Sequence, residues 1–101
     1  GVVREYLDIL LPANWDELDL YARREFIRGN EFSEGLKGEV QRKQVSTLEI
    51  WCELFGKEPS AMRKIDAYEI NAMMRKIEGW EKIEKIVRLP IYGPQRVYAK
   101  M

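Results

Sequence analysis

Apolar residues recur at helical spacing near the middle of the chain. Ser46 and Glu49, three residues apart, form a capping box that predicts where the first helix begins. Val45 and Ile50 flank that start as a hydrophobic staple, and Gly56 predicts the end of the helix. The residues expected on its buried face recur at i, i+3, i+4 and i+7: Leu48, Trp51, Cys52 and Phe55.

A second helix is predicted over 66–77, with Asp66 as its N-cap and Glu69 three residues later. Its apolar face comprises Ala67, Ile70, Met73, Met74 and Ile77. Its outer face comprises Tyr68, Asn71, Ala72, Arg75 and Lys76. Two helices joined by a turn, the second with such an outer face, are typical of a protein that reads the DNA major groove. The alternative is a helical hairpin with a solvated polar face.

The pattern changes after Trp80. Turn residues at Pro90, Gly93 and Pro94 separate two stretches that we interpret as the strands of a β-hairpin, 81–88 and 95–100. A helix-turn-helix followed directly by a basic hairpin predicts a winged helix.

Two helices are expected before this unit. One spans Val2 to Leu11 and ends at Pro12. The other begins at Asn14 and closes at Gly29 and Asn30, and its buried side is expected to comprise Leu18, Tyr21, Ala22 and Phe26. The predicted fold is therefore mostly α with a small β-hairpin, a winged helix-turn-helix preceded by two N-terminal helices. We expect a single domain over 1–101, with a helical pair at 1–30, a loop at 31–44 and the winged helix at 45–101, as a piece of a larger protein.

Composition narrows the possible functions. The 101 residues carry no net charge, but residues 1–56 hold 7 Lys/Arg against 11 Asp/Glu and residues 57–101 hold 10 against 6. This asymmetry indicates a binding surface in the second half. The single cysteine, Cys52, fits a cytoplasmic protein, and no stretch predicts a membrane span.

No motif for catalysis or for a cofactor is present. The chain has no histidine, no phosphate-binding glycine loop and no metal-ligand spacing of cysteines. The acids Asp16, Glu17 and Asp19 are explained by their position in the first turn of a helix. We therefore expect no enzyme activity, no cofactor and no metal in this chain.

Basic and amide side chains supply the candidate site. On the helix, Asn71 is expected to pair with adenine and Arg75 with guanine, with Tyr68 and Lys76 beside them. Phosphate contacts are expected from the hairpin residues Lys82, Lys85, Arg88, Gln95, Arg96 and Lys100. Arg42 and Lys43, before the first cap, are expected to make secondary phosphate contacts. The acids Glu81 and Glu84 weaken this surface.

Four segments resemble the C-terminal domain of the virulence-associated protein E family, which comprises primase/helicase-like proteins of phages and prophages. They are LPANWDELDLYARREFI (11–27), RKQVSTLEIWCELFG (42–56), DAYEINAMMRKIEGW (66–80) and YGPQRVYAK (92–100), in the order of the family. The resemblance implies an ATPase module upstream in the parent protein and a role in replication of the element. That module is absent from this chain, so the resemblance implies a terminal accessory domain.

Three functions remain open at this point. The first is DNA binding, with duplex DNA as the expected partner, by a winged-helix domain of a replication protein. The second is a protein-interaction module that docks the upstream ATPase module or other replication proteins. The third is an enzyme fragment with a substrate in the cleft between the N-terminal helices and the winged portion.

Overall fold

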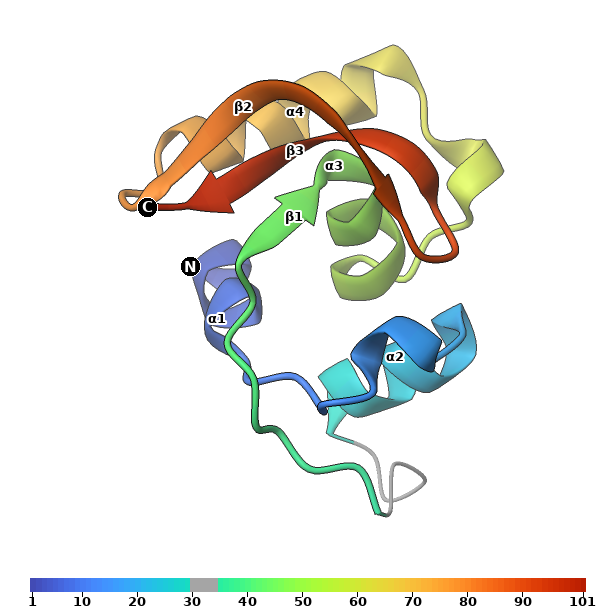
Figure 1. Cartoon of the computed structure of the whole chain (residues 1–101). Helices are drawn as coiled ribbons and strands as arrows, with labels where there is room; N and C mark the ends of the chain where they lie inside the picture. The colour runs from blue at the N-terminus through green and yellow to red at the C-terminus, as the bar shows by residue number, and fades with distance from the viewer. Residues whose placement is uncertain (30–34) are drawn as a thin grey trace.

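The protein is described by a computed structural model, which covers residues 1–29 and 35–101. Helices pack against a three-stranded antiparallel sheet, so the fold is mixed α/β and the expectation of a mostly helical chain is only partly correct (Figure 1). The stretch 30–34, which includes the predicted helix end at Asn30 and the start of the predicted loop, lies outside the described residues. Within the described ranges, no helix has the length and apolar character needed to cross a membrane.

The N-terminal segment holds α1 (Val2–Asp8), the 3₁₀ turn η1 (Trp15–Glu17) and α2 (Leu20–Arg28). The prediction of one continuous helix from Asn14 is wrong, because the chain is extended at Leu18 and Asp19, between η1 and α2. Asp19 caps α2 instead, and its Oδ1 accepts a 2.8 Å hydrogen bond from the backbone N–H of Ala22. Gly29 ends α2 in the left-handed conformation, as predicted.

The first capping box is confirmed. The backbone N–H of Glu49 donates to Ser46 Oγ at 3.1 Å, and Glu49 Oε2 accepts from the backbone N–H of Ser46 at 2.6 Å. The helix comprises one turn of α3 (Thr47–Glu49) and then the wider π-helical turn η3 (Ile50–Leu54). The short strand β1 (Gln44–Ser46) precedes it and was not predicted, because three residues are too few for alternation to be visible.

The 3₁₀ turn η4 (Pro59–Ala61) leads into α4 (Lys64–Arg75). The prediction of Asp66 as N-cap is wrong, because the cap position lies three residues earlier, at Arg63, and α4 begins at Lys64. Asp66 is the third helical residue, and its Oδ2 accepts a 2.9 Å hydrogen bond from the backbone N–H of Arg63. Asp66 therefore accepts the hydrogen bond from the backbone of the cap residue, a role that the sequence pattern assigned to Glu69.

The predicted hairpin is present with longer strands, β2 (Trp80–Leu89) and β3 (Gly93–Lys100). The strand order is β1-β3-β2, so β3 is the central strand and pairs antiparallel with both neighbours. An irregularity in pairing lies between Lys82 and Ile86 on β2, and the hairpin is strongly bent along its length (Figure 1). Helix α4 runs behind the hairpin in this view.

The core lies between α1, the α3–η3 helix, α4 and the sheet. Its fully or nearly fully buried members are Val3, Tyr6, Leu7, Val45, Ile50, Ile70, Met74, Trp80 and Tyr98. On the first predicted helix, Cys52 is buried as expected, but Leu48, Trp51 and Phe55 are only half-buried. Ile50 is the apolar residue of this helix that is fully buried along with Cys52, because the π turn changes the angle between successive side chains after Glu49.

The buried side of α2 also differs from the prediction. Tyr21 is 69% exposed, whereas Arg23 is only 1% exposed and Glu25 is buried. Burial of a charged side chain is costly unless it is paired, so the environment of Arg23 identifies an organised polar cluster.

Candidate nucleic-acid interface

The outer face of α4 exposes three of the side chains that the sequence predicts to face DNA. Tyr68 is 65% exposed, and Arg75 and Lys76 are exposed as well. Ile70 and Met74 lie on the opposite side of the helix and are buried in the core. This division fixes which side of α4 a partner can reach.

Tyr98 on β3 lies where α4 and the hairpin meet. The Nζ atom of Lys82 is 5.7 Å from the centroid of the Tyr98 ring, as their cross-strand pairing requires. Burial raises the pKa of the Tyr98 hydroxyl, and the positive charge of Arg75 partly offsets that rise. Asn71 of α4 accepts a 2.7 Å hydrogen bond from the Tyr98 hydroxyl, and Arg75 follows it by one helical turn. Arg75 of α4 and Lys82 of β2 therefore lie on either side of this junction.

Arg96 lies two residues before Tyr98 on β3, so both side chains project from the same face of the strand. Arg96 is exposed, and its guanidinium donates a 3.2 Å hydrogen bond to the backbone carbonyl of Glu84 across the hairpin. Lys100, two residues after Tyr98, is exposed as well. The structure thus brings Lys82, Arg96 and Lys100 onto the face of the hairpin that also adjoins Arg75.

The remaining hairpin residues that were predicted to contact DNA differ in their exposure to solvent. Lys85 and Arg88 are exposed, as are the carboxylates of Glu81 and Glu84. Gln95 points to the other face of β3, where it is half-buried, and its Nε2 donates a 3.1 Å hydrogen bond to the carbonyl of Tyr92. Gln95 therefore stabilises the hairpin turn, which corrects its expected place among the phosphate contacts.

Asn71 is also not on the outer face of α4. It is half-buried against the sheet, and its Oδ1 accepts hydrogen bonds from the hydroxyls of Tyr98 at 2.7 Å and Thr47 at 3.1 Å. Bidentate pairing with adenine requires both the oxygen and the nitrogen of the amide. Because the oxygen already accepts two internal hydrogen bonds, the expected adenine contact is corrected to a structural role.

Arg42 is corrected in the same way. It is 3% exposed, and its NH2 lies 3.3 Å from Glu53 Oε1. The guanidinium stacks on the ring of Tyr6, at 4.5 Å from its centroid. Arg42 is therefore not a cation on the exposed surface that a DNA backbone would contact, whereas the neighbouring Lys43 is exposed.

Glu53 occupies the centre of a buried polar cluster that the sequence patterns did not reveal. Its carboxylate accepts hydrogen bonds at 2.7 Å from the hydroxyls of both Tyr6 and Tyr92. It also lies 3.4 Å from the guanidinium of Arg23 and 3.3 Å from that of Arg42. Its side chain is fully buried, so α1, α2, the segment before β1 and the tip of the hairpin converge on one carboxylate.

The electrostatics of this cluster favour charged arginines and neutral tyrosines. Burial raises the pKa values of Tyr6 and Tyr92, and the charge of Glu53 raises them further. Burial opposes the charge of Arg42, but Tyr6, Glu53 and Glu49 together raise its pKa above the ordinary value. No spacing in the sequence links these residues, since each lies on a different element.

Glu49 adjoins this cluster, and its pKa is raised to about 7 by burial and by the charge of Glu53. Its Oε1 lies 4.0 Å from the guanidinium of Arg42. Within 1–29 and 35–101, the acids and the cysteine form no group of three that could hold a metal ion. The chain matches no protein-family model and no curated protein sequence.

Proposed function

We propose that the chain is a winged-helix domain that binds duplex DNA, with α4 in the major groove and the β2–β3 hairpin as the wing. The order of elements supports this proposal, because a helix pair is followed directly by an antiparallel hairpin and the hairpin packs on the second helix. On this proposal the domain serves a phage- or prophage-encoded replication protein of the primase/helicase type, with an ATPase module elsewhere in the polypeptide.

The observation that carries the proposal is the contact of α4 with the hairpin at Tyr98: Asn71 of α4 accepts the hydrogen bond of the Tyr98 hydroxyl, and Lys82 of β2 lies over the Tyr98 ring. Arg75 follows Asn71 by one turn of α4. One cation comes from the proposed recognition helix and the other from the proposed wing. A duplex that admits α4 into its groove would bring its phosphates to the hairpin, where Lys82 supplies positioning contacts.

The attachment of Tyr92 to Glu53 shapes how the wing would act. Because the tip of the hairpin is fixed to the body of the protein, the tip does not enter the minor groove. The flank of the hairpin, with Lys82, Lys85 and Arg96, is the surface that contacts the DNA backbone.

The test is the salt dependence of binding to a labelled DNA duplex, followed by fluorescence anisotropy. If about four phosphates are contacted, the slope of log K against log salt concentration is about −3.6. Lys82→Gln should reduce the magnitude of the slope by about 0.9. Lys37→Gln, at an exposed site in the segment that precedes β1, is the matched control and should leave the slope unchanged. The absence of binding to duplex DNA at low salt would overturn the proposal.

Variants of two arginines separate base reading from phosphate contact. Arg75→Ala should weaken binding to a preferred sequence by about 1–3 kcal/mol and relax the preference. Arg96→Ala should weaken binding to all sequences alike. Equal effects of both variants on random DNA would show that α4 reads no base.

A second function, docking of a protein, is favoured by apolar exposure on α4. Ile65 is 51% exposed and Met73 is 41% exposed, and Val2 of α1 is 60% exposed beside Met73 in a shallow pocket. An apolar contact depends little on salt. This alternative would be favoured if the domain bound the parent ATPase module with an affinity that does not change with salt concentration, and if it bound no DNA.

A further inference from the structure

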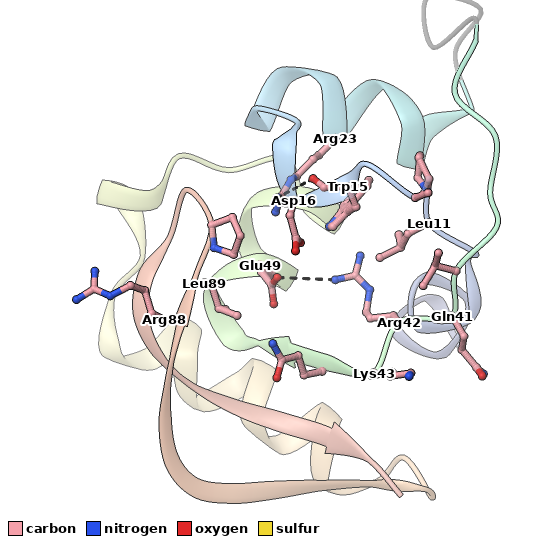
Figure 2. A pocket seen from close by; sticks show the side chains of 15 residues that line it. Leu11, Trp15, Asp16, Arg23, Gln41, Arg42, Lys43, Glu49, Arg88 and Leu89 are labelled. Atoms are coloured by element: carbon pink, nitrogen blue, oxygen red, sulfur yellow. Dashed lines mark hydrogen bonds and ion pairs between the residues drawn. The ribbon is translucent and has the colours of Figure 1, made fainter.

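A pocket of about 450 Å³ separates the N-terminal segment from the tip of the hairpin (Figure 2). Its walls come from the residues between α1 and α2, from the segment that leads into β1, and from the end of β2. Leu11, Pro12 and Leu89 provide apolar wall. The volume falls in the range of pockets that hold small molecules, roughly 300–1,000 Å³.

Arg42 crosses the interior of this pocket in Figure 2. Its position is fixed on three sides by Glu53, by Glu49 and by the ring of Tyr6. Among the described residues, its buried Nε–H has no hydrogen-bond acceptor. A buried donor without an acceptor costs about 1–3 kcal/mol, so an acceptor placed there would be stabilised.

Two residues beside Arg42 in the chain contribute exposed side chains to the pocket. Gln41 and Lys43, the two neighbours of Arg42 in the chain, are exposed and line the same pocket. Exposed side chains change rotamer within picoseconds to nanoseconds, so an entering group can displace them.

Positive charge outweighs negative charge around the pocket, even when the buried carboxylate of Glu53 is counted against Arg23 and Arg42. Lys43 and Arg88 lie on its rim and extend outward in Figure 2, and Arg23 and Arg42 lie in its wall. The acids are Asp16, which is exposed, and Glu49, which is held by the backbone N–H of Ser46. Such a distribution attracts anions to the mouth of the pocket.

We propose that this pocket binds a small organic oxyanion, a carboxylate or a phosphate monoester with a compact apolar body. An oxygen of the ligand accepts the Nε–H of Arg42, and the apolar body packs on Leu11, Pro12 and Leu89. Lys43 and Arg88 swing over the mouth and balance the charge. The site shares Arg88 of β2 with the hairpin but lies away from α4, and it does not depend on DNA binding.

The test follows the Nε–Hε resonance of Arg42 by NMR in the whole chain at constant ionic strength. The probes are acetate, benzoate, inorganic phosphate and phenyl phosphate, with benzamide as the uncharged analogue of benzoate. We expect saturable shifts of this resonance. Benzoate and phenyl phosphate should bind at least ~10-fold more tightly than acetate and phosphate, because the ring buries apolar surface. The tighter of the two aromatic anions identifies the preferred oxyanion.

Rim variants provide the second readout. Lys43→Gln and Arg88→Gln should each weaken the binding of benzoate roughly threefold to tenfold, because each removes one charge from the mouth. Lys57→Gln, an exposed lysine outside this pocket, is the matched control and should have no effect. All three sites are exposed, so the variants should fold.

Three results would overturn the proposal. The first is a response to all probes no larger than that to chloride, which would leave water as the acceptor for Arg42. The second is equal binding of benzamide and benzoate, which would make the pocket an apolar slot. The third is a shift of the Arg42 resonance on addition of a DNA duplex with no measurable affinity for the free anions, which would assign the site to a backbone phosphate.

Discussion

The hydroxyl of Tyr92, at the tip of the hairpin, donates a 2.7 Å hydrogen bond to Glu53 Oε2 in the π turn, 39 residues earlier in the chain. This contact joins the C-terminal hairpin to the cluster that also fixes α1 and α2. Four donors surround one buried carboxylate, so the removal of any one of them leaves the other three arranged around a less satisfied charge.

Tyr92→Phe should lower the free energy of unfolding by about 1.5–3 kcal/mol, because a hydrogen bond to a charged group is lost. Chemical denaturation measures this loss, and hydrogen exchange should show faster opening of the hairpin tip. Tyr68→Phe is the matched control, since the side chain of Tyr68 is largely exposed. It should change stability by no more than about 0.5 kcal/mol. Equal stability of Tyr92→Phe and the parent would mean that the tip is not held by Glu53.

Glu53→Gln should be more severe and cost roughly 3–5 kcal/mol, because Arg23 and Arg42 remain buried without their counter-charge. Thermal and urea denaturation would measure the loss. Glu58→Gln serves as the control, since its carboxylate pairs with Arg24 while its side chain is 73% exposed. That pair is worth about 0–1 kcal/mol. A loss at position 53 as small as that at position 58 would contradict the central role of this carboxylate.

Glu49→Gln should remove a dependence of stability on pH. The folded pKa of Glu49 is about 7, above the unfolded value of about 4.3, so the proton stabilises the folded state. This stabilisation is complete below the unfolded pKa and is lost as pH rises through 7. Relative to the Gln variant, which keeps the acceptor of the capping box, the parent should lose on the order of 1–3 kcal/mol between pH ~4.5 and ~7.5. Parallel stability curves for the two proteins over that interval would show that Glu49 titrates normally.

Asn71→Ala should act on stability rather than on DNA recognition. The Ala variant leaves the hydroxyls of Tyr98 and Thr47 without their shared acceptor, at a cost of about 1–3 kcal/mol. Glu69→Ala, an exposed site on the same helix, is the control and should cost little. DNA affinity per folded molecule should be unchanged for Asn71→Ala. If Asn71→Ala instead kept full stability and lost its preference for one DNA sequence, Asn71 would be a base contact.

Local patterns predicted the elements of this fold better than their ends. The capping box at Ser46, the stop at Gly29 and the turn around Gly93 depend on residues close in sequence, and all three are present. The start of α4 was misplaced because two acids, Asp66 and Glu69, both fit a cap pattern. Only the contact between Asp66 and Arg63 decides which of them lies at the start of the helix.

The candidate interface was predicted in part. Tyr68, Arg75 and Lys76 are exposed on α4 because helical periodicity alone places them opposite Ile70 and Met74. Asn71 lies at the edge of that face, and periodicity could not show that a tyrosine of the sheet would bind it. Gln95 was misassigned because the face to which a strand residue points depends on the pairing register.

The sequence by itself determined which stretches of the chain form helices, that Tyr68, Arg75 and Lys76 of α4 face outward, and that a basic hairpin follows, since these depend on neighbours within a few positions. The tertiary structure decided which charges are free. Arg23 and Arg42 look like surface cations in the sequence, yet both are buried against Glu53. The physical reason is that pairing of buried charges depends on the approach of elements far apart in the chain, and no local spacing records that approach.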